Sequence, residues 1–135
     1  MSSEPVPSTP APTHAVGIDM IEIDRVAKVL ARHPRRFIER VYTPEEAAFC
    51  RGRVPELAAR FAAKEAVMKA LGTGWSLGIR WTDIAVENNG AGKPTVQLSG
   101  VAERLAGKLA VSTVHLSLAH TRHYASAQVV MEGCL

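Results

Sequence analysis

The chain has 135 residues, a length that supports one domain with a hydrophobic core and excludes a second catalytic domain. Hydrophobic residues make up 47% and charged residues 21%, which is typical of a globular protein and unlike a disordered chain. The net charge of +3 favours anionic partners, whereas only 5% of the residues are aromatic, which leaves few rings for stacking on nucleic-acid bases.

The cysteines and the hydropathy of the chain indicate where in the cell the protein is expected. Cys50 and Cys134 lie far apart with no second cysteine near either, so the sequence predicts neither a disulfide framework nor a zinc knuckle. No apolar run approaches the ~18 residues of a membrane span, and the N-terminus lacks the basic and apolar segments of a secretion signal. We therefore predict a cytoplasmic protein that binds neither a membrane nor nucleic acid.

The first 13 residues carry four prolines among Ser, Thr and Ala, which predicts a disordered tail ahead of a domain over residues 14–135. This domain begins with a β-type run from His14 to Ile18. Asp19 follows directly, and a carboxylate at the end of a strand is well placed for chemistry.

Three helical segments are predicted after this strand. Apolar residues recur at helical spacing over Ile23–Leu30, and His33-Pro34 ends that segment. Thr43-Pro44-Glu45-Glu46 predicts a capping box at the start of a short helix. The longest segment, Glu56–Leu71, ends at Gly72, and its six alanines let another backbone or a ligand come close.

The second half of the chain is rich in β-type segments. Strands are predicted at Trp81–Glu87, Thr95–Leu98, Val111–Leu118 and Tyr124–Met131, with one helix at Val101–Leu109. Asn89-Gly90 forms a turn between the first two strands, which predicts a hairpin. This order of elements predicts an α+β fold in which an antiparallel sheet packs on the long central helix.

Asp19 and Glu65 are candidate ligands of a divalent metal, because Mg²⁺ bound to a phosphate substrate needs only one or two protein carboxylates. Arg60, Lys64 and Lys69 place cations beside Glu65 on the same predicted helix, which suits a polyphosphate with its metal. An ion pair between Glu65 and Lys69 on a solvated helix face explains the same spacing without a ligand.

Other motifs are less informative. His115, His120 and His123 lack the context of a zinc site, although His120 stands in a predicted turn where it could meet an anion. The chain has no GxGxxG, GxxxxGK[ST] or GxSxG motif, which excludes the common dinucleotide fold, the ordinary P-loop and the serine-hydrolase elbow.

Basic residues recur at helical spacing opposite the apolar stripe of the first predicted helix. They are Arg25, Lys28 and Arg32, with Arg35 just beyond. An acidic protein helix could dock on such a face, but opposed apolar and charged faces are also what any solvated surface helix shows.

Four motifs follow one another in a fixed order between about residues 15 and 131. They are Val16-Gly17-Ile18-Asp19 with Glu22 and Arg25, Arg60–Ala66 followed by Lys69–Gly74, Gly92-Lys93-Pro94, and His115–Thr121. In these motifs the chain resembles the small holo-acyl-carrier-protein synthases, the single-domain group of 4′-phosphopantetheinyl transferases.

The resemblance implies a reaction. The family transfers 4′-phosphopantetheine from coenzyme A to a serine of an apo acyl carrier protein, releases adenosine 3′,5′-bisphosphate and uses Mg²⁺. By this resemblance Asp19 and Glu65 would bind the metal, Lys69 the bridging phosphates, and Arg60 and His120 the 3′-phosphate end of coenzyme A. Asp19, Glu65 and Lys69 would thus form the catalytic set.

The resemblance also implies contacts away from the metal. Thr121 and the Lys93-Pro94 loop would contact the adenine side, with Lys64 and Gly72 as further coenzyme A contacts. The basic residues Arg25, Lys28, Arg32 and Arg35 match the family's docking helix for the carrier protein. The family is typically a homotrimer with active sites at subunit interfaces.

Two questions remain open at this level. We hypothesise that Glu65 accepts the serine proton through a metal-bound water, and near-full turnover by a Glu65→Gln variant at saturating Mg²⁺ would contradict this. The alternative function is a non-catalytic basic module that binds an acidic helix or nucleic acid. Such a module needs the basic stripe but neither Asp19 nor Glu65.

Overall fold

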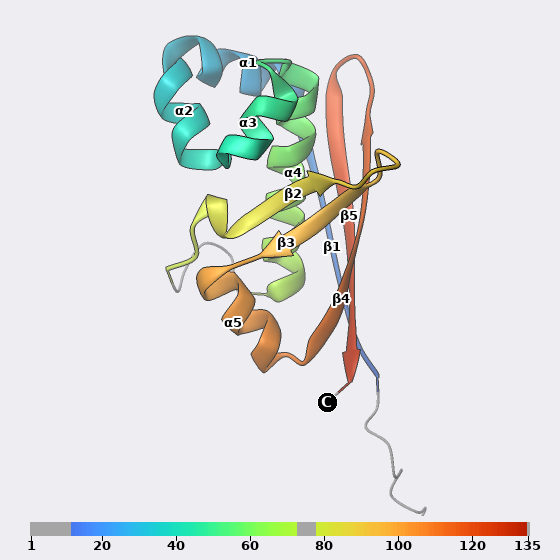
Figure 1. The fold of residues 1–135 in the computed structure, drawn as a ribbon. Helices are drawn as coiled ribbons and strands as arrows, with labels where there is room; N and C mark the ends of the chain where they lie inside the picture. Colours follow the sequence, from blue (N-terminus) through green and yellow to red (C-terminus); the bar gives the residue numbers. More distant parts are fainter. Residues whose placement is uncertain (1–11, 73–77, 135) are drawn as a thin grey trace, which may run out of the picture.

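The computed structural model describes residues 12–72 and 78–134 (Figure 1). The elements in chain order are β1 (Pro12–Glu22), α1 (Ile23–Arg32), α2 (Pro34–Val41), α3 (Pro44–Cys50), α4 (Val54–Leu71), the 3-10 turn η1 (Trp81–Asp83), β2 (Ile84–Asn88), β3 (Pro94–Leu98), α5 (Gly100–Lys108), β4 (Val111–His120) and β5 (Tyr124–Cys134). One antiparallel sheet has the order β1-β5-β4, and β2 and β3 form a separate hairpin. The predicted α+β architecture is confirmed.

Several boundaries differ from the predictions. The tail was predicted to reach residue 13, but Pro12 already belongs to β1, and the rest of the tail lies outside the described residues. Pro34 does not only end α1; it also occupies the first turn of α2, where its fixed φ favours a new helix. Trp81–Asp83 is a 3-10 turn rather than strand, because the Asp83 carboxylate accepts the Arg80 backbone N–H at 3.1 Å.

The central helix α4 is enclosed by the rest of the molecule (Figure 1). It packs against β1, β5 and β4 of the sheet and against β2 of the hairpin. Most of its residues are buried, and its alanines let the neighbouring elements approach closely. Among the described residues, no helix is long and apolar enough to cross a membrane.

An ion pair lies inside this core. The side chains of Lys64 and Glu46 are both 0% exposed, and Lys64 Nζ lies 2.8 Å from Glu46 Oε1. Lys64 Nζ also donates to the carbonyl oxygens of Trp81 and Ile84, while Glu46 Oε2 accepts the Val86 backbone N–H at 2.9 Å. Burial lowers the pKa of Lys64, and the Glu46 charge opposes that shift. The pair therefore joins α3, α4 and β2 at one point.

Glu46 also belongs to the capping box at the N-terminus of α3, and this fixes its position. Its backbone N–H donates to Thr43 Oγ1 at 3.2 Å, and its Oε1 accepts the Thr43 backbone N–H at 2.9 Å. The predicted capping box is thus confirmed. The same carboxylate serves the cap and the buried ion pair.

Replacing Lys64 by Met should leave the Glu46 carboxylate buried without its cation. Breaking a buried pair in this way costs about 3–5 kcal/mol, so we expect the free energy of unfolding in urea to fall by that amount. As a control, Arg35→Met removes the exposed pair with Glu39 and should change stability little. Similar losses in both variants would contradict a special role for the buried pair.

Candidate active site

The position of Asp19 depends on how closely β1 approaches α4. Gly17 packs directly on the helix, and a Cβ added there would lie 1.8 Å from the Ala66 carbonyl oxygen. Only glycine permits this approach. Residues two apart share one face of a strand, so Asp19 points to the same side as Gly17.

Lys69 of α4 meets Asp19 across this contact. Lys69 Nζ lies 3.0 Å from Asp19 Oδ1 and 3.0 Å from the Ile18 carbonyl oxygen. The Asp19 side chain is 17% exposed, whereas that of Lys69 is 57% exposed. The alternative prediction was an ion pair between Lys69 and Glu65 within the helix. It does not account for this contact, because Lys69 pairs with Asp19, 50 residues earlier in the chain.

A cavity of about 310 Å³ opens beside Asp19. Glu65 lines the same cavity, so the structure brings together the two carboxylates that were predicted from β1 and α4. Arg25 of α1 lies at the cavity as well, and the apolar part of the wall includes Phe37 and Phe61. A charged substrate that entered here would meet both signs of charge and an apolar wall.

The donor set at this cavity fits a hard divalent cation. Asp19 and Ile18 already hold the Lys69 ammonium with a carboxylate and a carbonyl oxygen, the ligand types that Mg²⁺ prefers. Within residues 12–72 and 78–134, no group of three or more His, Cys, Asp or Glu is arranged to bind a metal. A cation bound by Asp19 and Glu65 would therefore complete its shell with ligand oxygens and water.

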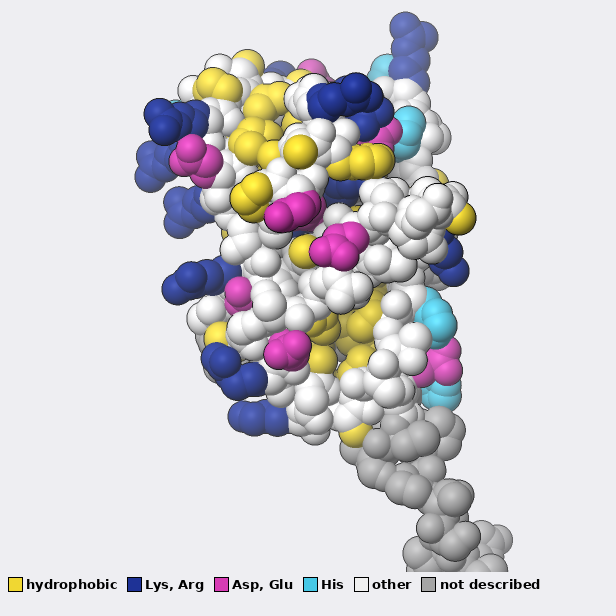
Figure 2. All heavy atoms as spheres, in the orientation of Figure 1, with side chains coloured by type: hydrophobic (Ala, Val, Ile, Leu, Met, Phe, Trp, Pro, Cys, Tyr) yellow, Lys and Arg dark blue, Asp and Glu magenta, His cyan; other side chains and the backbone are white. Residues whose placement is uncertain are grey.

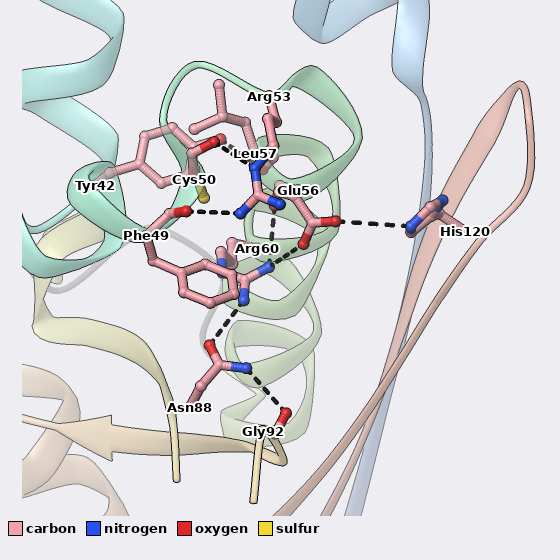
Figure 3. A network of polar contacts seen from close by, with 10 residues as sticks. All are labelled: Tyr42, Phe49, Cys50, Arg53, Glu56, Leu57, Arg60, Asn88, Gly92 and His120. Carbon is pink, nitrogen blue, oxygen red and sulfur yellow. Dashed lines mark hydrogen bonds and ion pairs between the residues drawn. The ribbon is translucent and has the colours of Figure 1, made fainter. Parts of the chain in front are cut away.

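A second polar cluster surrounds Arg60, one helical turn before Lys64 (Figure 3). The Arg60 side chain is 2% exposed, and its guanidinium lies 4.3 Å from the centroid of the Phe49 ring. Its NH1 donates to Glu56 Oε2 at 3.1 Å, and its NH2 donates to Asn88 Oδ1 at 2.9 Å. Asn88 Nδ2 in turn donates to the Gly92 carbonyl at 3.1 Å. Arg60 therefore ties the β2–β3 turn to α4.

The end of β4 faces the same cluster. His120 Nε2 lies 3.9 Å from Glu56 Oε1, and the His120 side chain is 46% exposed (Figure 3). Thr121 follows in the β4–β5 turn, where its hydroxyl oxygen accepts the backbone N–H of Tyr124 at 3.2 Å. The structure thus brings Arg60 and His120 together, but through Glu56 rather than by direct contact.

Four further residues were expected to contact coenzyme A, and only Lys64 is placed against that expectation. Lys64 was expected to contact coenzyme A, but its fully buried ammonium has no surface to offer a ligand, so this expectation is wrong for the structure described. Gly72 caps α4 with φ of 76° and lies next to residues outside the described range. Lys93 is exposed in the β2–β3 turn, and Pro94 begins β3.

The three histidines have different surroundings. His115 Nε2 lies 2.7 Å from Glu132 Oε1, whereas His120 faces Glu56 and His123 stands in the β4–β5 turn. They do not form one cluster.

The basic stripe divides between two helices. Arg25, Lys28 and Arg32 lie on α1, and Lys28 Nζ pairs with Asp24 at 2.9 Å. Arg35 lies on α2 rather than on the same helix, and it pairs with Glu39 at 3.0 Å. Lys and Arg side chains lie over this helical end and continue down the same edge of the molecule (Figure 2).

Sequence reasoning missed three participants in the Arg60 cluster. The Glu56–Arg60 ion pair could have been predicted from the sequence, because the two residues are four apart on one helix. The contacts of Phe49 and Asn88 could not, because these residues reach Arg60 from α3 and β2 through tertiary packing.

Comparison with known proteins identifies the class. Residues 15–129 match the model of the 4′-phosphopantetheinyl transferase superfamily, so the chain belongs to that superfamily.

The relatives place it among the small synthases within that superfamily. A holo-(acyl-carrier-protein) synthase of Solibacter usitatus is 47% identical over 120 residues, which cover 87% of this chain and 96% of the relative. A Bacillus anthracis holo-(acyl-carrier-protein) synthase, solved with CoA (3′,5′-ADP), is 37% identical with a TM-score of 0.72, covering 88% of this chain and 96% of that chain. A Helicobacter pylori synthase solved with coenzyme A has 29% identity and a TM-score of 0.79, covering 86% and 98%.

Replacing Gly17 by Ala should push β1 away from α4, because the new methyl group has no space against the Ala66 carbonyl. We expect a loss of about 2–5 kcal/mol in stability, as for other severe steric changes in a core. Thermal and urea unfolding would measure this.

Gly107→Ala provides the matched control. This glycine lies in α5 with no atom within 4 Å of an added Cβ, so alanine should stabilise the helix by about 0.5–1 kcal/mol. A tolerated Gly17→Ala would show that β1 does not need this close approach.

Proposed function

We propose that this chain transfers 4′-phosphopantetheine from coenzyme A to a serine hydroxyl of an apo acyl carrier protein, leaving adenosine 3′,5′-bisphosphate. The observation that carries the proposal is that Asp19 of β1 and Glu65 of α4 line one cavity, while Lys69 of α4 pairs with Asp19. Relatives solved with coenzyme A support the choice of donor.

We propose Asp19 and Glu65 as ligands of Mg²⁺. The bound ion would supply charge stabilisation for the pyrophosphate of coenzyme A, both as the nucleophile approaches and as the leaving phosphate gains charge. Lys69 would supply further positive charge to those phosphates. It can do so by turning its exposed ammonium from Asp19 to a phosphate oxygen. Glu65 lines the cavity and is the proposed acceptor of the serine proton.

The far end of coenzyme A would lie at the second polar cluster. His120 is half exposed there and can meet the 3′-phosphate. Arg60 is almost fully buried, so its positive charge would attract the phosphate without direct contact. Lys93 and Thr121 are exposed in the two turns and remain candidates for the adenine side.

We also propose that the basic side of α1 receives an acidic helix of the carrier protein. Arg25 supports this assignment because it lies on α1 and also lines the cavity beside Asp19. A partner bound along this helix would hold its serine close to the proposed metal site. Arg32 and Arg35 extend the same basic side onto α2.

The outer face of β1 supports self-association. Val16, Ile18 and Met20 are 60%, 60% and 65% exposed, and they alternate with Gly17 and Asp19, which face α4. Three neighbouring apolar side chains on an open strand face are typical of an interaction surface. We propose that this face contacts further copies of the chain in a homotrimer.

Intact-mass spectrometry of an apo carrier protein tests the function. Incubation with the chain, coenzyme A and Mg²⁺ should add one phosphopantetheine, and a chelator should prevent the gain. Asp19→Asn should lower turnover by about 100-fold or more at any carrier concentration, because the metal loses a charged ligand. Arg25→Glu should instead raise the KM for the carrier protein by about tenfold, because it reverses a charge at the docking face.

These variants also distinguish the transferase from the alternative function, a non-catalytic basic module. A basic module that binds an acidic helix would keep its partner in the Asp19→Asn variant and would never modify it. If the wild-type chain binds coenzyme A but modifies none of several apo carriers, the transferase proposal fails.

An Ile18→Asp variant tests the proposed subunit contact. A charge at the centre of the apolar face should shift the oligomer to monomer in analytical ultracentrifugation, while circular dichroism stays unchanged because the side chain is exposed. Glu87→Asp, an exposed change on β2, is the control. A wild-type chain that sediments as a monomer would contradict the proposal.

A further inference from the structure

Glu56 stands between the guanidinium of Arg60 and the imidazole of His120 in the second polar cluster. Its two carboxylate oxygens are used separately, Oε2 toward Arg60 NH1 at 3.1 Å and Oε1 toward His120 Nε2 at 3.9 Å (Figure 3). The sequence motifs singled out Arg60 and His120 but not this residue. Glu56 is therefore the connection between an enclosed guanidinium and a half-exposed imidazole.

Arg60 is held firmly enough to fix Glu56 in return. Besides the ion pair, its NH1 also approaches the Glu56 backbone carbonyl at 3.4 Å, its NH2 binds Asn88, and its plane lies over Phe49. A guanidinium with these partners and 2% exposure has little freedom to reorient, although its buried Nε has no hydrogen-bond partner among the described residues. The carboxylate bound to it is consequently held in place as well, with its second oxygen turned to the end of β4.

The charge balance of the cluster makes this arrangement useful for an anion. Arg60 compensates the negative charge of Glu56, so this carboxylate does not by itself exclude an anion from the site. His120 Nε2 faces Glu56 Oε1 at 3.9 Å, and this contact orients the ring at the surface. The free side of the imidazole then remains available for a phosphate oxygen.

We propose that Glu56 is a positioning residue for the 3′-phosphate of coenzyme A, acting through His120. This inference rests on the proposed function, which places that phosphate at His120. It adds a requirement that the motifs did not contain: selectivity for the 3′-phosphorylated donor depends on a carboxylate that does not itself touch the phosphate.

Binding to the full-length chain tests the inference without catalysis. Isothermal titration calorimetry would compare adenosine 3′,5′-bisphosphate with adenosine 5′-monophosphate, which lacks the 3′-phosphate. We expect Glu56→Gln to weaken binding of the bisphosphate by about five- to tenfold and to change binding of the monophosphate by less than about twofold. Glu45→Gln, which removes an exposed carboxylate from the first turn of α3, should change neither.

A double-mutant cycle shows whether the effect passes through His120. In a His120→Gln background, Glu56→Gln should cause no further loss of discrimination between the two nucleotides. In the transfer assay, Glu56→Gln should raise the KM for coenzyme A and leave kcat and the KM for the carrier protein unchanged. A purely structural role would lower kcat or weaken both nucleotides alike.

The outcomes separate the two proposals. If the wild-type chain transfers phosphopantetheine and prefers the bisphosphate, but Glu56→Gln keeps the same preference, the positioning role is wrong and the proposed function stands. Additive effects of the two substitutions would overturn the route through His120. If the wild-type chain neither transfers the group nor distinguishes the nucleotides, both proposals fail.

Discussion

The contact between β1 and α4 is the constraint on which the site depends. Gly17 allows the strand backbone to touch the helix backbone at Ala66, and this contact sets Asp19 opposite Lys69 and beside Glu65. Neither element could supply the site alone. The strand contributes one carboxylate and a carbonyl, and the helix contributes a carboxylate and a cation. The distance between these groups is set by the packing of the two backbones. Side-chain rotation could not make up for a strand that lies farther from the helix.

Two of the lysines on α4 form charged pairs with different roles, one in the core and one at the proposed site. Lys64 turns into the interior and gives its charge entirely to Glu46 and backbone oxygens. Lys69, little more than one turn later, lies at the surface and holds Asp19 with an ammonium that solvent and ligands can reach. Two lysines five residues apart thus differ completely in exposure. Sequence spacing alone treated them as equivalent.

This difference shows what the sequence could and could not predict. Local signals found the capping box at Thr43, the end of α4 at Gly72 and the hairpin after Asn89, because each depends on neighbours within a few residues. Asp19 and Glu65 were also singled out together, first as two carboxylates that could bind a divalent metal and then through the family motifs. Burial of Lys64 was not predictable, because its partners come from two distant parts of the chain, Glu46 on one side and Trp81 and Ile84 on the other.

The two faces of β1 have different side chains and different proposed roles. Gly17 and Asp19 point to the helix, while the apolar side chains between them point outward. Because side chains alternate at every residue, a deletion or insertion of a single residue within the strand would exchange the two faces completely. It would set bulky side chains against Ala66 and turn the carboxylate away from the cavity. We therefore expect this strand to tolerate a substitution on one face more readily than any change in its length.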